Sequence, residues 1–209
     1  MFSTYQLPFN FDADALRADL DQVLPEEWRP HFNRGYYEGE WKALALRSTT
    51  GQAKEIYRAP NDTREAIETI VLSRCVYFQK VLNAFECPIL TARLMSLGPG
   101  SRILEHEDFF LGFEYGSIRI HIPITTDRRV EFFLAGERLQ MKEGEAWYID
   151  FGRPHRVNNL SDQNRVHLVI DCTVNEWLRA LFPTGTIPQE AAEVQSQFVE
   201  SSEAREVKE

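Results

Sequence analysis

From residue 89 to residue 171 the sequence is divided into short segments of β-forming residues, and this pattern constrains the fold more than any other feature. Turn signals such as Pro99-Gly100 and Ala135-Gly136 separate the segments. Many short strands at this spacing are typical of a β-sandwich or barrel, so we expect a mainly β fold. The expected strands are Ala92–Leu97, Ile103–Leu104, Ser117–Ile124, Val130–Leu134, Ala146–Phe151, a short strand at Val157, and Val166–Asp171.

The N-terminal part, residues 1–88, predicts a supporting layer of helices with one extended segment. Asp12 is suited to cap a helix that ends before Pro25, and Tyr36–Arg47 alternates as a strand does. Residues 62–85 predict a second helical region, because Asp62 and Glu65 have the spacing of a capping box. A closing helix is expected over residues 175–182.

Composition excludes several classes of function. The chain has 209 residues and a net charge of −9, of which −4 lies in an acidic segment, 188–209, that we expect to be a flexible tail. An acidic chain is a poor general nucleic-acid binder, and no apolar run has the length of a membrane span. The first residues lack the pattern of a signal peptide, and three cysteines without a CxxC motif suit free thiols, so we expect a cytoplasmic protein.

His106, Asp108 and His155 are candidate metal ligands. Residues two apart on a strand face the same way, so His106 and Asp108 would project together while Glu107 turns away. With His155 they would form the two-histidine, one-carboxylate set of non-haem Fe(II) oxygenases, which leaves coordination positions open. An HxD pattern alone also suits a histidine and an aspartate in a surface loop.

Two strands carry an Arg-x-His pattern on the face expected to point inward. Arg119 and His121 lie on one strand, and Arg165 and His167 on another. Inward polar side chains are costly without partners, and a guanidinium offers two fixed donors to a carboxylate. Structural ion pairs are the alternative for Arg119, and a satisfied core histidine is the preferred interpretation of His167.

The sequence resembles the aspartyl/asparaginyl β-hydroxylase family of Fe(II)- and 2-oxoglutarate-dependent dioxygenases. The similarity is carried by four segments in order, RLMSLGPGSRILEHED, SIRIHIPITT, MKEGEAWYIDFGRPHRVNN and RVHLVIDC, and by GYYEGEWKALALRS upstream. It implies a double-stranded β-helix, also called a jelly roll and cupin-like, with the N-terminal helical layer in support. Residues 1–187 would then be a single dioxygenase domain, with its β-helix core and closing helix in residues 89–187.

The resemblance also implies cofactors and roles. It places Fe(II) on His106, Asp108 and His155, and 2-oxoglutarate on Arg165, with His121 and Arg119 near the cosubstrate. Dioxygen would complete the reaction, in which 2-oxoglutarate is decarboxylated to succinate and a ferryl intermediate hydroxylates a C–H bond. The expected substrate is a small molecule of amino-acid type, free, carrier-bound or peptidyl, and the expected oligomeric state stays open.

Other residues allow two interpretations each. Phe109, Phe110 and Phe113 form a lid or pack under the mouth of the barrel, and Arg47 and Arg93 meet a substrate carboxylate or form structural ion pairs. His31 is interpreted as a surface or capping residue. Two rival functions remain open: a non-catalytic cupin-like binding or sensor protein, and a metal cupin enzyme that does not use 2-oxoglutarate.

Overall fold

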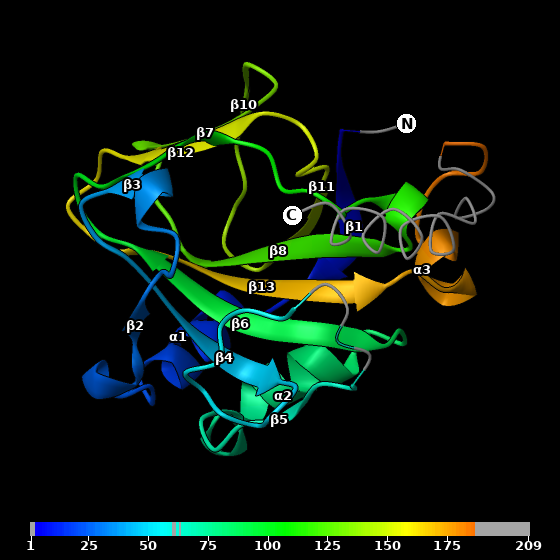
Figure 1. Cartoon of the computed structure of the whole chain (residues 1–209), viewed down its shortest axis with the longest axis horizontal. Coiled ribbons are helices and arrows are strands. Elements are labelled where there is room, and N and C mark those ends of the chain that lie inside the picture. The colour runs from blue at the N-terminus through cyan, green and yellow to red at the C-terminus, as the bar shows by residue number, and fades with distance from the viewer. Residues whose placement is uncertain (1–2, 60–61, 63, 187–209) are drawn as a thin grey trace, which may run out of the picture.

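The computed structural model describes residues 3–59, 62 and 64–186, and its main feature is a pair of antiparallel sheets that face each other (Figure 1). The larger sheet has the strand order β1-β11-β8-β13-β6-β4-β2, with β5 paired to β4, and the smaller sheet has the order β10-β9-β12-β7-β3. The strands are β1 (Thr4–Asn10), β2 (Arg29–Pro30), β3 (Tyr37–Glu38), β4 (Trp41–Ser48), β5 (Ile67–Glu68), β6 (Ile89–Leu97), β7 (Arg102–His106), β8 (Ser117–Thr125), β9 (Val130–Leu134), β10 (Glu137–Leu139), β11 (Glu145–Ile149), β12 (His155–Asn159) and β13 (Arg165–Thr173). This arrangement is the predicted jelly roll.

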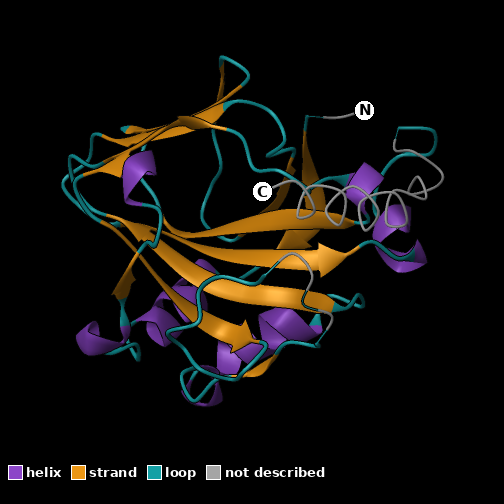
Figure 2. Ribbon diagram, in the orientation of Figure 1, coloured by secondary structure: helices purple, strands orange, loops and turns teal. Residues whose placement is uncertain are grey.

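Three α-helices, α1 (Ala13–Leu20), α2 (Val76–Asn83) and α3 (Glu176–Ala180), accompany the sheets in the described residues. Figure 2 shows α1 and α2 against the face of the larger sheet that lies away from the smaller sheet. Leu16 of α1 and Phe78 of α2 are buried there in one cluster with Ile120 and Leu168 of the sheet. The larger sheet is therefore covered on both faces, by helices on one side and by the smaller sheet on the other.

Successive side chains of β13 point to opposite faces of the larger sheet, and the face toward the smaller sheet is polar. Val166, Leu168 and Ile170 belong to the cluster under the helices. The intervening residues, which include Arg165, His167 and Asp171, point to the space between the two sheets. That space also holds a second apolar cluster, which includes Phe132, Phe151 and Trp41. The interior of the jelly roll thus combines buried charges with aromatic side chains.

The prediction of a helix over residues 62–85 is wrong for its first half. Residues 67–68 form β5, where Arg47 lies opposite Glu68, and only Val76–Asn83 is α-helical. The Asp62 side chain does not cap a helix; its Oδ1 accepts a hydrogen bond of 3.0 Å from the backbone N–H of Arg64 and forms a local turn. Ile67 and Ile70 are exposed, so their spacing did not mark a buried helical face.

The remaining N-terminal predictions are confirmed in part. The Asp12 side chain caps α1 by accepting from the N–H groups of Asp14 and Ala15, and β4 occupies most of the predicted extended segment. The helix ends at Leu20, four residues earlier than expected, and residues 4–10 form a strand that the sequence analysis did not predict. Part of the N-terminal layer, namely β1 and β4, therefore forms strands of the larger sheet.

The predictions for the closing helix, the cysteines and a membrane span can be compared with the described residues. The closing helix is present as α3, with Asn175 as its N-cap. Cys75, Cys87 and Cys172 are buried free thiols, as expected. No helix among the described residues is long and apolar enough to cross a membrane. The predicted acidic tail, 188–209, lies outside the described residues.

Gly144 fixes the N-terminal strand to the jelly roll, and its replacement should be costly. Its φ is +83°, and a Cβ there would lie 2.1 Å from the carbonyl oxygen of Phe11, whose own N–H donates to the Gly144 carbonyl. We expect Gly144→Ala to lower the free energy of unfolding in urea by about 3 kcal/mol, from backbone strain plus the clash.

Gly136→Ala is the matched control for that substitution. Gly136 has nearly the same φ, +82°, but nothing lies within 4 Å of the added Cβ. It should cost only about 1 kcal/mol, the backbone strain alone. Equal losses in the two variants would show that the close approach of Phe11 is unimportant.

Candidate metal and cosubstrate site

The structure brings His106, Asp108 and His155 together between neighbouring strands of the smaller sheet. His106 ends β7, His155 begins β12, and the two residues are partners in the antiparallel ladder. Asp108 follows two residues after His106 and is held by its N–H, which donates to the carbonyl of Phe151 at 2.8 Å. One ligand atom from each of the three side chains lies within 4.8 Å of the other two.

Hydrogen bonds to the backbone orient both imidazoles for metal binding. Nδ1 of His106 lies 2.8 Å from the Leu104 carbonyl, and Nδ1 of His155 lies 2.9 Å from the Arg153 carbonyl. A carbonyl only accepts, so each Nδ1 carries the proton and each Nε2 keeps a free lone pair. Burial lowers the pKa of His155 to about 4, which keeps this ring neutral at pH 7. The donor set therefore fits a divalent transition metal with open positions.

Arg119 lies beside this triad and joins two carboxylates. One of its terminal nitrogens contacts Oδ2 of Asp108, and its Nε donates to Oδ1 of Asp171 at 2.6 Å. The contacts of Arg119 are thus ion pairs, which is the alternative that the sequence analysis gave beside a role near the cosubstrate. Oδ1 of Asp108 remains on the side of His106, 3.8 Å from its Nε2.

Arg165 is buried without a carboxylate partner in the part of the chain that the structure describes. Its terminal nitrogen donates to Nδ1 of His167 at 3.0 Å, and its Nε has no hydrogen-bond partner there. Burial lowers the pKa of Arg165 to about 9, so the side chain is still charged at pH 7. A buried cation of this kind is costly, and its guanidinium is chemically suited to an anionic partner.

His121 lies in the same cluster of side chains as Arg165 and His167. Its Nδ1 lies 3.2 Å from Nδ1 of His167, while its buried Nε2 has no partner among the described residues. Burial, together with the charge of Arg165, lowers the pKa of both histidines well below the usual value. Arg165, His167 and His121 therefore form a cluster with two unused polar atoms, and His167 serves as a partner within it.

Phe151 contacts both the triad and the cluster around Arg165, and the sequence analysis did not identify it as a site residue. Its ring lies 4.7 Å from the His155 ring and 4.8 Å from the His121 ring, and the Arg119 guanidinium lies 5.5 Å from it. The residue is buried. The only signal in the sequence was its position four residues before His155.

The interpretation of His31 as a surface or capping residue is wrong. The imidazole is buried and stacks on Trp41 with ring centroids 3.6 Å apart. It lies close enough to Arg93, Asp108, Arg119 and His106 to interact with their charges, and burial followed by the charge of Arg93 lowers its pKa to about 4. His31 is thus part of the wall of the interior.

The buried position of His31 predicts a dependence of stability on pH. The unfolded chain takes up a proton near pH 6.5 and the folded protein only near pH 4, so stability is lost as the pH falls through this window. His31→Phe keeps the stacking and should reduce the difference in unfolding free energy between pH 7 and pH 4.5 by about 2 kcal/mol. An unchanged difference, measured by urea unfolding at both pH values, would contradict the assignment.

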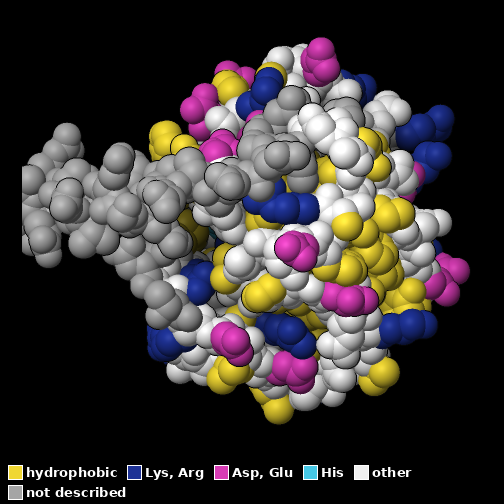
Figure 3. Space-filling model, turned by 90° about the vertical axis from the view of Figure 1, so that its right-hand side faces the viewer, with side chains coloured by type: hydrophobic (Ala, Val, Ile, Leu, Met, Phe, Trp, Pro, Cys, Tyr) yellow, Lys and Arg dark blue, Asp and Glu magenta, His cyan; other side chains and the backbone are white. Residues whose placement is uncertain are grey.

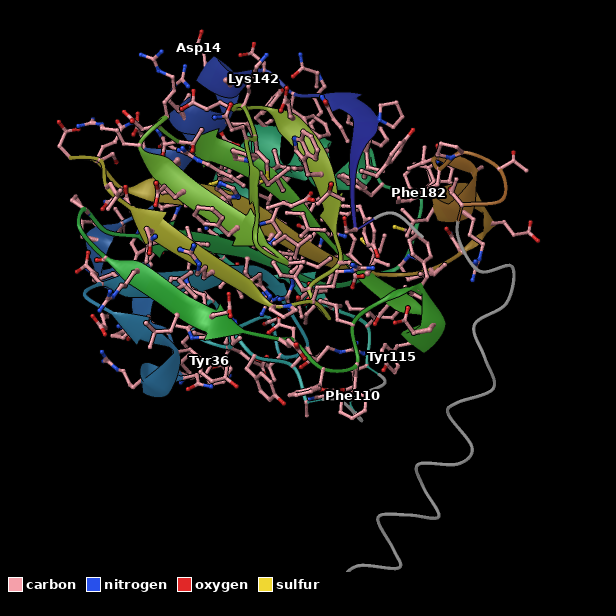
Figure 4. All side chains as sticks on the ribbon, turned by 90° about the horizontal axis from the view of Figure 1, so that it is seen from above. Asp14, Tyr36, Phe110, Tyr115, Lys142 and Phe182 are labelled. Atoms are coloured by element: carbon pink, nitrogen blue, oxygen red, sulfur yellow. The ribbon has the colours of Figure 1, made fainter. Side chains whose placement is uncertain are left out.

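Aromatic side chains gather at the edge of the molecule next to the triad. The Tyr36 ring lies 4.6 Å from that of His106, and Figure 4 places Tyr36 toward the same edge as Phe110 and Tyr115. Phe109 and Phe110 are exposed, whereas Phe113 is buried and packs against Tyr148 and Phe182. Of the three phenylalanines, only Phe113 therefore fits the alternative of packing under the mouth of the barrel.

The other side chains considered in the sequence have structural partners. Arg47 pairs with Glu68, and the buried Arg93 pairs with Asp171 and donates to the Ile56 carbonyl. Basic and acidic side chains alternate over the face in Figure 3, outside the part covered by grey atoms. That face shows no continuous basic patch of the kind that binds nucleic acid.

Comparison with known proteins decides the family. The sequence model described as Aspartyl/Asparaginyl beta-hydroxylase matches residues 10–174, which is most of the chain. The chain belongs to the aspartyl/asparaginyl beta-hydroxylase family. This membership confirms the resemblance found in the sequence.

The chain is also similar to individual proteins, at low sequence identity. An L-proline cis-4-hydroxylase of Rhizobium meliloti (strain 1021) is 24% identical over 163 residues, which cover 77% of this chain and 57% of that protein. A crystal structure of an oxidoreductase of the 2OG-Fe(II) oxygenase family from Burkholderia pseudomallei is similar with a TM-score of 0.51 and 16% identity, over 82% of this chain and 84% of that one. A Pseudomonas putida prolyl-4-hydroxylase structure has a TM-score of 0.49 and 12% identity, over 83% and 93%. The Burkholderia structure supports the jelly-roll fold.

Proposed function

We propose that this protein is an Fe(II)- and 2-oxoglutarate-dependent hydroxylase that acts on an amino acid. The observation that carries the proposal is the combination of a His-Asp-His group, with ligand atoms within 4.8 Å, and a buried arginine that has no carboxylate partner among the described residues. A metal ion suits the first feature and an anionic cosubstrate suits the second. Family membership over residues 10–174 supports both assignments.

Each part of the site has a distinct task in this proposal. His106, Asp108 and His155 would hold Fe(II), and the hydrogen bond from Nδ1 of each imidazole to a backbone carbonyl leaves its Nε2 free for the metal. Arg165 would bind the distal carboxylate of 2-oxoglutarate, with His121 beside it. Bound Fe(II), 2-oxoglutarate and dioxygen would together supply the oxidising chemistry that hydroxylation of a C–H bond requires.

The apolar part of the interior would exclude water from the reacting groups. Phe132 and Phe151 are buried between the two sheets and lie against Arg165 and His155 respectively. Exclusion of water strengthens the contact between Arg165 and a carboxylate and protects reactive species from side reactions. The position of a substrate relative to the metal would then decide which C–H bond reacts.

An amino-acid substrate is supported by the name of the Rhizobium relative, an L-proline cis-4-hydroxylase. The chain spans 57% of the length of that protein. Free, carrier-bound and peptidyl amino acids all remain within the proposal.

The test is release of succinate from 2-oxoglutarate by the Fe(II)-loaded protein, with free amino acids and short peptides added one at a time. The proposal predicts that at least one of them stimulates succinate release and is itself hydroxylated, by mass spectrometry. A sensor protein would release no succinate with any compound. A 2-oxoglutarate-independent enzyme would turn over substrate equally well without the cosubstrate.

A further inference from the structure

Asp171 lies at the centre of a partly buried network that reaches the candidate metal ligand Asp108. It is on β13, and its carboxylate accepts four hydrogen bonds from three side chains on two neighbouring strands. Arg119 donates twice, at 2.6 Å from Nε and 3.1 Å from a terminal nitrogen, Arg93 donates at 2.6 Å, and the Thr91 hydroxyl donates at 3.1 Å. Such a carboxylate holds both guanidinium groups in fixed orientations.

The register of the larger sheet explains this convergence. Asp171 is the direct partner of Arg119 on β8 and of Thr91 on β6, and Arg93 is the next residue of β6 on the same face. The four side chains therefore form one row across three strands. Charges alternate from Asp108 through Arg119 and Asp171 to Arg93, so the half-buried Arg119 and the buried Arg93 each have an anionic neighbour.

Arg119 contacts only one oxygen of Asp108. That oxygen is Oδ2, while Oδ1 faces Nε2 of His106 at 3.8 Å. An oxygen held by a guanidinium is less available as a ligand than one that faces the other metal-binding atoms. The contact with Arg119 thus leaves Oδ1 of Asp108 on the side of His106, and Arg119 is in turn hydrogen-bonded to Asp171.

We infer that Asp171 is a positioning residue for the metal centre: it holds Arg119 against Oδ2 of Asp108, so that Oδ1 alone is presented to the metal beside His106 and His155. The inference rests on the proposed function for the identity of the site. It assigns β13 a double task, because Arg165 and Asp171 lie on the same face of this strand, six residues apart. One strand would thereby set both the cosubstrate anchor and the geometry of a metal ligand.

The experiment measures metal affinity and requires no turnover. Cobalt(II) is titrated into the metal-free protein, and binding is followed by visible absorption. Loss of a partner that orients a metal ligand typically weakens metal binding 10–100-fold, so we expect Asp171→Asn to raise the Co(II) dissociation constant by about tenfold or more. The absorption bands of the bound Co(II) should also shift, because the coordination of Asp108 changes.

Two further variants separate positioning from net charge and from failure to fold. Arg93→Met leaves the contacts from Asp171 through Arg119 to Asp108 in place, and its Co(II) affinity should stay within about twofold of the wild type. The double variant Arg93→Met/Asp171→Asn removes one positive and one negative charge, so it keeps the charge balance while Arg119 loses its anchor. It should fold even where Asp171→Asn does not, and its Co(II) affinity should still be about tenfold lower than that of the wild type.

Each outcome has a single meaning for the inference. Wild-type affinity and an unshifted spectrum in the double variant would overturn it, because charge balance alone would then explain the network. Weakened binding in the double variant with normal binding in Arg93→Met would support it. A wild-type protein that binds no Co(II) at the triad would instead overturn the proposed function, which makes the two failures distinguishable.

Discussion

Asp108→Ala is expected to abolish hydroxylation, with a loss of at least about a thousandfold in kcat/KM, equivalent to about 4 kcal/mol. The substitution removes the only carboxylate of the three grouped ligands and leaves His106 and His155 to hold the metal. It also removes the contact that Arg119 makes with Asp108. Substrate-dependent succinate release and Fe(II) binding, measured on the same preparation, should fall together.

Glu107→Ala is the matched control for this experiment. Glu107 is the adjacent carboxylate, is exposed, and does not belong to the grouped ligands. Its loss should leave both Fe(II) binding and succinate release close to wild type. Full activity in Asp108→Ala, or an equal loss in Glu107→Ala, would show that the triad is wrongly assigned.

Arg165→Met should have opposite effects on catalysis and on stability. The guanidinium is buried without a carboxylate partner in the described residues, so an apolar side chain of similar length removes a desolvated charge. We expect the metal-free variant to be more stable than the wild type by about 1 kcal/mol or more in urea unfolding. The KM for 2-oxoglutarate should rise about a hundredfold, because a charge-assisted bidentate contact is lost.

Ligand-linked stability provides the control for Arg165→Met. Saturating 2-oxoglutarate with a redox-inert divalent metal should raise the melting temperature of the wild type and not that of the variant. Arg102→Ala, which removes an exposed arginine paired with Glu38, should respond like the wild type. A variant that keeps its 2-oxoglutarate response would mean that the cosubstrate anion binds elsewhere.

The sequence was sufficient to predict the parts of the site that depend on local periodicity. The period of two along a strand predicted that His106 and Asp108 project together, and they do so although β7 ends at His106. The same period placed Arg165 and His167 on the inner face of β13. The resemblance to a family then connected these segments across 47 residues to His155. The structure brings all of these residues into one interior.

Side-chain contacts that depend on how two strands are aligned could not be predicted from the sequence. The pairing of Asp171 with Arg119 depends on how β13 is aligned with β8, and no local pattern specifies that alignment. His31 was misjudged for the same reason, since its burial follows from the return of β2 beside β4, where the ring stacks on Trp41. Residues 62–70 were predicted as helical because Ile67 and Ile70 fit a helical period, although both are exposed. Tertiary pairing with β4 decided the conformation there.

The most direct test of the central claim is the visible charge-transfer absorption of the anaerobic protein reconstituted with Fe(II) and 2-oxoglutarate. We expect a weak visible band that requires both components, because the proposed triad leaves adjacent coordination positions for a 2-oxo acid. At limiting 2-oxoglutarate the band should be lost in Arg165→Met and retained in Arg102→Ala. Absence of the band in the wild type would contradict the proposed Fe(II) and 2-oxoglutarate site. A band unchanged by Arg165→Met would contradict the proposed role of Arg165.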